Sequence, residues 1–273
     1  MQTKKIHNKT VKTIPIGPEG KDIRPVRGSD YIETCFANVM LVAKKNSGKT
    51  TVIYNLLKAC AGPKTTIVAF VATLNKDPSW ASIKKHFEDR GIAFIGHTSL
   101  KEDGTDLLKD LVQELENPDE KKDTDEVKSE EATTMLSFDA TKSSELVKKK
   151  ERKDRFQTPE YIFIIDDLSD EMGSPSVTAL LKKNRHFRCK VILSSQYLND
   201  LSKPARKQID IWILFKSLSR EKLETVYGDS DLSTPFDDFL KMYNEATVNE
   251  FGFLYIDSRR EMFRKNFNEQ FEL

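Results

Sequence analysis

The sequence predicts an α/β fold in which helices cover both faces of a mostly parallel β-sheet. Three observations support this expectation. Short apolar runs alternate with amphipathic segments. A loop ending in Gly-Lys-Thr joins the first apolar run to the first helical pattern, and a later run ends in two aspartates. Parallel strands have their carboxyl ends at one edge, so these polar ends should converge there.

The first apolar run covers residues 39–42 and is short enough for a buried strand. Apolar side chains recur three or four residues apart over residues 52–60, as a helix with one buried face requires. A strand, an eight-residue loop and a helix in this order predict a phosphate-binding loop, the P-loop. Its backbone N–H groups surround phosphate oxygens, and the helix N-terminus adds partial positive charge.

The P-loop therefore supplies the candidate nucleotide-binding residues. Lys49 is expected to reach the β- and γ-phosphates of ATP, and Thr50 to offer its hydroxyl to Mg²⁺. Position 43 holds Ala where the pattern has Gly, which is tolerable if φ stays negative; a chance match or a decayed site is the alternative. The full set is Ala43, Lys44, Lys45, Asn46, Ser47, Gly48, Lys49, Thr50 and Thr51.

The second informative run, residues 161–165, is apolar or aromatic throughout and ends at Asp166 and Asp167. Such a run is typical of a strand buried on both faces. Asp166 is expected to hold Mg²⁺ through water, as a Walker B acid does. Asp167 is placed to orient an attacking water molecule or to deprotonate it as a general base. A strand followed by an ordinary polar turn is the alternative.

Further polar candidates follow in the chain. Gln196 comes directly after a strand predicted near residues 190–193, where an amide can sense the γ-phosphate of ATP. Arg206 is either an arginine finger that reaches a neighbouring subunit or a surface arginine. Arg185 and His186 precede the same strand; they contact phosphate, DNA or another subunit, or are structural.

The remaining elements continue the alternation. Phe236, Phe239, Leu240 and Tyr243 have helical spacing and are expected to pack in the core. Two strands around residues 258–260 predict a C-terminal edge hairpin. Strands are expected at 65–71, 92–95, 210–215, 253–257 and 262–267, and helices at about 78–90, 105–116, 175–183 and 204–208.

The chain divides into an arm and one domain. Residues 1–30 are polar, basic and rich in Gly and Pro, and we expect a partly disordered arm. Residues 31–273 form a single P-loop domain interrupted at 117–157. That interval holds 11 acidic and 10 basic residues and few large apolar ones, so we expect a disordered or mobile insertion. Its basic cluster at 148–153 is either solvated or contacts phosphate or a nuclear-import receptor.

Composition is typical of an intracellular protein. The net charge is +1 with 32% charged residues, so any binding of nucleic acid must use local patches. Cys35, Cys60 and Cys189 have no metal-ligand spacing and are expected to be reduced core residues. No apolar stretch is long enough to span a membrane. The N-terminus lacks the apolar region of a signal peptide, so we do not expect secretion.

The order of these motifs resembles a known family. After the P-loop and the paired aspartates come Arg185-His186, Ser195-Gln196 and Arg206, and then Glu245-Ala246-Thr247 ahead of an aromatic strand at 251–257. This order, over residues 36–116 and 160–268, is similar to the poxvirus-type virion DNA-packaging ATPases of nucleocytoplasmic large DNA viruses. They lie within the FtsK/HerA group of P-loop ATPases.

The resemblance implies a function, partners and a refinement of the fold. It implies additional strands beside the P-loop and Walker B strands, the ASCE arrangement. It also implies an ATPase, with ATP and Mg²⁺, that moves double-stranded DNA into a capsid as a homo-oligomeric ring contacting capsid or portal proteins. Catalysis would use Lys49, Asp167, Gln196 and Arg206. The site of action would be a virus assembly site in host cytoplasm or nucleus, or the virion.

Other classes of protein use the same P-loop. A nucleotide-dependent switch or a small-molecule kinase is the main alternative, and a non-catalytic scaffold with a degenerate site is another. The paired aspartates with a downstream Gln suit attack by water better than transfer to another acceptor, and no arginine-rich lid is evident.

Overall fold

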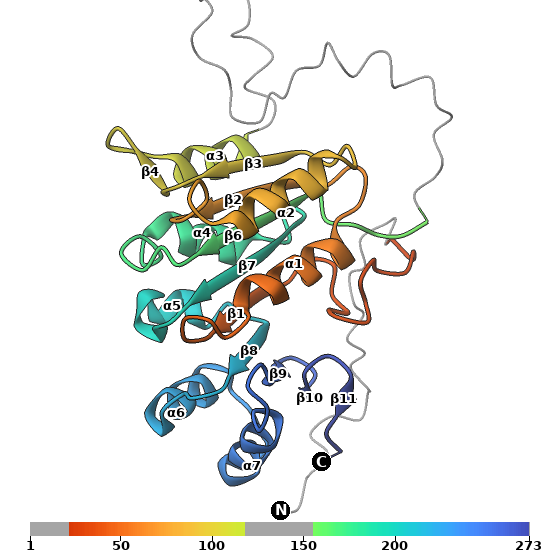
Figure 1. Ribbon diagram of the computed structural model, residues 1–273, viewed down its shortest axis with the longest axis vertical. Coiled ribbons are helices and arrows are strands. Elements are labelled where there is room, and N and C mark those ends of the chain that lie inside the picture. The colour runs from red at the N-terminus through yellow and green to blue at the C-terminus, as the bar shows by residue number, and fades with distance from the viewer. Residues whose placement is uncertain (1–21, 118–154, 273) are drawn as a thin grey trace, which may run out of the picture.

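A nine-stranded β-sheet forms the centre of the molecule in a computed structural model that describes residues 22–117 and 155–272 (Figure 1). The strand order is β11-β10-β9-β8-β1-β7-β6-β2-β3. The strands are β1 (Asn38–Val42), β2 (Thr66–Val71), β3 (Phe94–His97), β6 (Tyr161–Asp166), β7 (Cys189–Ser195), β8 (Ile211–Phe215), β9 (Phe253–Asp257), β10 (Met262–Lys265) and β11 (Glu269–Gln270). A separate two-stranded ribbon pairs β4 (Lys101–Glu102) with β5 (Thr105–Asp106).

Six adjacent strands, from β8 to β3, are mutually parallel. Strand β7 lies between β1, which leads into the predicted P-loop, and β6, which ends in the paired aspartates. This is the additional-strand arrangement that the family resemblance implies. The predicted α/β fold is confirmed.

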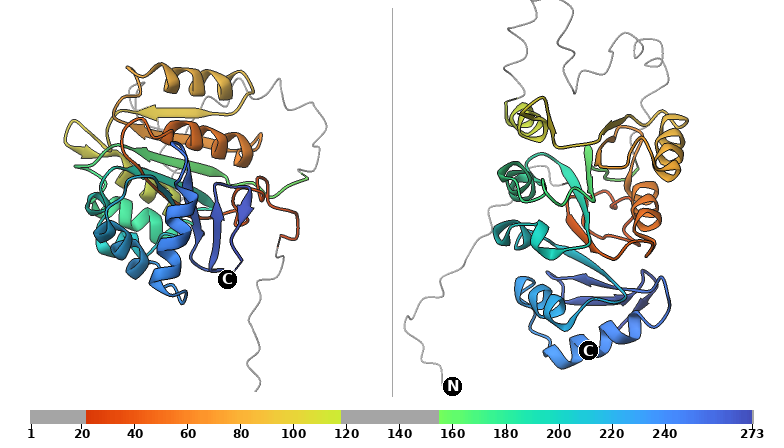
Figure 2. Two further views of the ribbon diagram at one scale, coloured as in Figure 1. Left: turned by 60° about the horizontal axis from the view of Figure 1, so that its bottom comes forward. Right: turned by 60° about the vertical axis from the view of Figure 1, so that its left-hand side comes forward.

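Helices cover both faces of the sheet (Figure 2). α1 and α2 pack on one face, and α3, α4, α6 and α7 on the other, with one apolar cluster on each side. Successive strand residues alternate between the clusters; Val39 faces one and Met40 the other. The helices are α1 (Lys49–Cys60), α2 (Pro78–Glu88), α3 (Leu107–Glu116), α4 (Pro175–Lys183), α5 (Lys203–Arg206), α6 (Arg220–Asp229) and α7 (Phe236–Ala246), with a 3₁₀ turn at Leu198–Asp200.

The C-terminal hairpin is confirmed and is longer than expected. β9 pairs antiparallel with β8, β10 with β9, and β11 with β10, so the antiparallel part adds three strands to one edge. Phe267 packs beside Phe253, Tyr255 and Tyr31, with ring centroids 4.8–6.0 Å apart. The edge is therefore attached to the N-terminal segment by an aromatic cluster.

Several elements differ from the sequence-based expectation. Helix α6 was not predicted, because only Leu223 and Val226 of its ten residues are buried. Strand β3 begins at Phe94 rather than at position 92, because the Ile92 N–H bonds to the Phe87 carbonyl and belongs to the end of α2.

The expected arm and insertion lie mostly outside the described residues. Parts that are described have defined contacts: Val26 forms a β-bridge with Gln157, and the Arg27 N–H donates to the Gln157 carbonyl at 2.9 Å. All three cysteines are buried and free, as expected. Among the described residues, no helix is long and apolar enough to cross a bilayer.

Asn38 joins three elements at the amino edge of the parallel strands. Its side-chain amide donates to the carbonyls of Leu181 and Gln208, both at 2.8 Å, and its backbone N–H donates to Asp210. Asn38 is buried, so these hydrogen bonds form away from water.

We predict that Asn38→Leu lowers the free energy of unfolding by about 2–4 kcal/mol, because two buried carbonyls lose their donor. Chemical denaturation measures this change. Asn75→Ala, at an exposed asparagine, should cost less than about 0.5 kcal/mol. A loss below about 1 kcal/mol for Asn38→Leu would show that the two carbonyls find other donors.

Candidate functional site

The predicted P-loop joins β1 to α1 as a compact turn. Two residues have left-handed backbone, Asn46 with φ 60° and Gly48 with φ 87°. Gly48 is the N-cap of α1, and its carbonyl accepts the Val52 N–H at 3.1 Å. The Ser47 hydroxyl donates to the Lys44 carbonyl and closes the loop. The loop thus leads directly into a twelve-residue helix whose N-terminus favours an anion.

Ala43 fits the position where the pattern has Gly. It is fully buried, and it is not among the described residues with positive φ. Its N–H donates to the Ser195 carbonyl at 3.2 Å. The condition set for tolerating Ala, a negative φ, is therefore met.

Strand register brings the distant motifs to one edge. Val42 of β1 pairs with Ser195 of β7, and Asp166 of β6 pairs with Ser194. The Asp167 N–H also donates to the Ser194 carbonyl at 3.1 Å. The P-loop, the two aspartates and Gln196, which follows β7, therefore share the carboxyl edge of the sheet.

Lys49 and Asp167 form an ion pair across this edge. The Lys49 Nζ lies 2.6 Å from the Asp167 Oδ1, and the Lys49 side chain is only 8% exposed against 36% for Asp167. Burying an ammonium group is costly without a partner, so Asp167 stabilises Lys49 here. Asp167 has φ 51°, a conformation that Asp adopts more readily than most residues.

Asp166 differs from its neighbour because it is buried. Loss of solvation raises its pKa from 3.8 to about 6, although Lys49 acts in the opposite direction. Its Oδ1 atom has no hydrogen-bond partner within the described chain. A buried carboxylate oxygen of this kind fits the support of Mg²⁺ through water. No cluster of three metal-binding side chains occurs in the described part, and a nucleotide-bound Mg²⁺ needs none.

Gln196 is half-buried beyond β7. Its carbonyl accepts a hydrogen bond from the Lys222 Nζ at 3.1 Å, and Lys222 also lies 5.1 Å from the Tyr197 ring centre. The Ser195 hydroxyl donates to Asp200. Sequence reasoning missed Lys222 and Asp200, since Lys222 lies on the unpredicted α6.

Arg206 is held inside its own subunit. Its Nε lies 2.5 Å from Asp229 Oδ2, and the two side chains are 12% and 7% exposed. Its Nη1 donates to the Leu201 carbonyl at 2.8 Å and, at 3.4 Å, to that of Leu198. This arrangement fits neither a surface arginine nor a side chain free to extend into a neighbour. The finger role stays untested.

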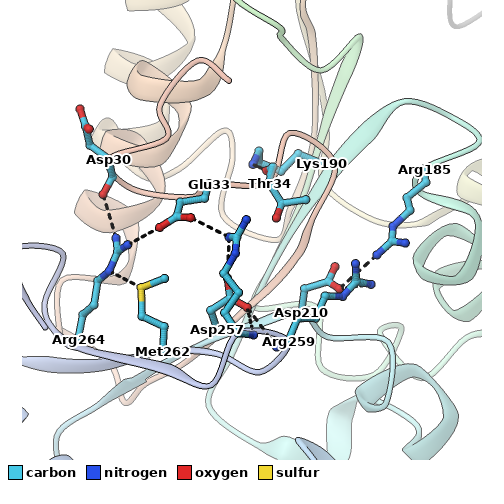
Figure 3. A network of polar contacts seen from close by, with 11 residues as sticks. Asp30, Glu33, Thr34, Arg185, Lys190, Asp210, Asp257, Arg259, Met262 and Arg264 are labelled. Carbon is cyan, nitrogen blue, oxygen red and sulfur yellow. Dashed lines mark hydrogen bonds and ion pairs between the residues drawn. The ribbon is translucent and has the colours of Figure 1, made fainter. Parts of the chain in front are cut away.

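Arg185 and His186 come just before β7 and therefore lie at the amino ends of the parallel strands. Figure 3 shows Arg185 beside Asp210. Because the predicted P-loop follows β1 at the opposite ends of the strands, Arg185 cannot reach a phosphate held by that loop in its own subunit. Arg185 approaches Asp210 at 3.9 Å, and Arg259 approaches the same carboxylate at 2.6 Å. These residues line a polar cavity of about 430 Å³, separate from the P-loop.

Comparison with known proteins gives matches of two kinds. No protein-family model matches the chain. The curated protein named uncharacterized protein 075L, from Invertebrate iridescent virus 6, is 24% identical over 105 residues. That match covers 37% of this chain and 41% of the relative, less than half of its length.

Solved structures give longer matches. The genome packaging NTPase B204 from Sulfolobus turreted icosahedral virus 2, in complex with AMP, superposes with a TM-score of 0.51 at 18% identity, over 85% of this chain and 96% of that chain. The complex of the same protein with sulfate superposes with a TM-score of 0.51 at 20% identity, over 85% of this chain and 96% of that chain. Its complex with AMPPCP superposes with a TM-score of 0.50 at 18% identity, over 85% of this chain and 97% of that chain. This chain therefore has the fold of a viral packaging NTPase, and the narrower poxvirus-type resemblance stays a prediction.

Proposed function

We propose that this chain is an ATP-hydrolysing motor that translocates double-stranded DNA and packages a viral genome into a capsid. One observation carries the proposal: the Lys49 ammonium lies 2.6 Å from the Asp167 carboxylate at the carboxyl ends of the strands. The buried Asp166 is the next residue. Phosphate-binding and water-activating groups are thus adjacent. The likeness to a packaging NTPase fold supports the biological setting.

The Lys49–Asp167 pair suggests how binding prepares hydrolysis. Lys49 would exchange Asp167 for the β- and γ-phosphates, because phosphate oxygens offer it more negative charge. Asp167 would then lose its cation and accept a proton from the attacking water. Gln196 would orient that water and report the γ-phosphate, with Lys222 fixing the backbone at Gln196. ATP binding would therefore release the general base.

Thr50 and Asp166 would hold Mg²⁺, the first through its hydroxyl and the second through water. The ion would neutralise charge on the phosphates. The remaining P-loop residues would bind phosphate through backbone N–H groups, which is consistent with the exposure of Lys44, Lys45 and Asn46.

Movement of DNA would require a homo-oligomeric ring that docks on capsid or portal proteins at a virus assembly site. In such a ring, one subunit completes the site of the next. Arg185 is 52% exposed at the amino edge, whereas Arg206 is tied to Asp229. Of the two arginines considered from the sequence, Arg185 is therefore the better placed to reach a neighbouring subunit. The neighbour would have to present its carboxyl edge there.

The direct test is steady-state ATP hydrolysis with Mg²⁺, with and without linear duplex DNA. We expect DNA to raise the rate, the specific activity to rise with protein concentration, and Lys49→Ala and Asp167→Asn to lower the rate about 10²–10⁴-fold. Lys84→Ala, in a half-exposed pair on α2, is the control and should leave the rate unchanged. Hydrolysis that ignores DNA and concentration would favour a switch or kinase.

Binding of Mg²⁺ with the nonhydrolysable analogue AMPPCP should weaken as pH falls from 7 to 5. With a pKa of about 6, Asp166 is mostly charged at pH 7 and mostly protonated at pH 5. A protonated carboxyl does not support the cation, so affinity should fall up to about tenfold per pH unit below 6. Calorimetry of wild type and Asp166→Asn at each pH separates protonation of Asp166 from protonation of the nucleotide itself. If the affinities of the two proteins change with pH in parallel, Asp166 is not the group responsible.

Arg206→Ala should lower the free energy of unfolding by about 3–5 kcal/mol, because it leaves the Asp229 carboxylate buried without its cation. Thermal or urea unfolding measures the loss. Lys241→Ala, which breaks an exposed pair, should leave the free energy of unfolding nearly unchanged. An Arg206→Ala protein of normal stability whose assembled rings no longer hydrolyse ATP would instead support the finger role.

A further inference from the structure

Exposed apolar side chains gather at the carboxyl edge of the sheet. The large hydrophobic residues exposed in the described chain are Ile23, Tyr197, Val248 and Phe251. Tyr197 follows Gln196, and the last two lie in the turn between α7 and β9. Phe253 at the start of β9 pairs with Phe215 at the end of β8, and β8 runs parallel to β1. This turn is therefore on the P-loop side.

Phe251 lies against the P-loop itself. A Cβ atom built on Gly48 would be 3.6 Å from the Phe251 Cδ1, an ordinary van der Waals distance. The ring nevertheless stays 59% exposed. One part of this aromatic side chain thus lies beside Gly48 of the candidate phosphate loop, and the rest faces solvent.

The turn that carries Phe251 is held in place. The Gly252 N–H donates to the Asn249 carbonyl at 3.1 Å, and Lys216 Nζ donates to the Val248 carbonyl at 2.8 Å. A Cβ at position 252 would come within 2.4 Å of the Ala246 carbonyl, so the close approach requires Gly. Phe251 is thus presented by a fixed turn rather than a free loop.

We infer that the Phe251 ring is the stacking platform for the nucleobase of the triphosphate bound at the P-loop. This inference rests on the proposed function and extends it to the base. Phosphates held by the loop leave the ribose and base to project beyond the start of α1, where a flat apolar surface is available. Aromatic rings stack on any base, because every base has a π-face.

The same surroundings predict weak discrimination between bases. The polar side chains nearest in the turn, Asn249 and Glu250, are exposed, as is Lys216. Exposed, flexible side chains read the edge of a base less sharply than buried donors and acceptors do. ATP and GTP should accordingly bind with similar affinity.

The test compares ligands with and without a base on the full chain. Calorimetry would measure the affinity of the chain for three ligands in the presence of Mg²⁺: AMPPCP, GMPPCP and inorganic tripolyphosphate. We expect Phe251→Ala to weaken both nucleotides about five- to a hundredfold and tripolyphosphate less than twofold. Phe251→Trp should keep nucleotide affinity. Val248→Ala is the matched control, since Val248 lies in the same turn and is 65% exposed; this change should leave the affinity for nucleotide and for tripolyphosphate unchanged.

Three results would overturn the inference. Unchanged nucleotide affinity in a folded Phe251→Ala protein would refute stacking and leave the ATPase proposal intact. Equal weakening of nucleotide and tripolyphosphate would mean that Phe251 only supports the P-loop. Wild-type protein that binds neither ligand would refute the proposed function, and the base site with it.

Discussion

The site depends on one constraint, the insertion of β7 between β1 and β6. Because these strands are parallel and in register, their polar ends lie at the same edge and one strand apart. β7 connects the two sides: its Ser194 carbonyl accepts the Asp167 N–H, and its Ser195 carbonyl accepts the Ala43 N–H. The one-strand gap leaves room for the Lys49 side chain to reach Asp167. A slip of β7 would displace both motifs together.

The fold and the phosphate loop could be predicted from sequence because they depend on local patterns. A strand buried on both faces is mostly apolar, so β1 and β6 are recognisable from short apolar runs. Helix α6 has no such pattern, because only two of its residues are buried, and β3 is displaced by the end of α2. The Lys49–Asp167 pair joins residues 118 positions apart, so no local pattern reveals it.

Arg206 illustrates the limit of assigning a role by residue type. The family resemblance implies a role in trans for Arg206, whereas in this chain its guanidinium bonds Asp229 and the Leu201 carbonyl. Its partner Asp229 is the last residue of α6, the helix that the sequence does not reveal. Arg185, by contrast, shares its carboxylate with Arg259 and remains half-exposed. The two arginines differ in their exposure and in the carboxylates that they contact, and neither property can be read from the sequence.

The charges at the carboxyl edge also bear on the form of nucleotide that the proposed site would bind. Asp166 and Asp167 place two carboxylates beside Lys49, while Lys44 and Lys45 of the loop are exposed. A free triphosphate would gain Lys49 but would also meet both carboxylates at close range. Mg²⁺ removes that repulsion, because the ion can be shared by the phosphates and Asp166. The two carboxylates therefore favour the metal complex over the free nucleotide as the ligand of the proposed site.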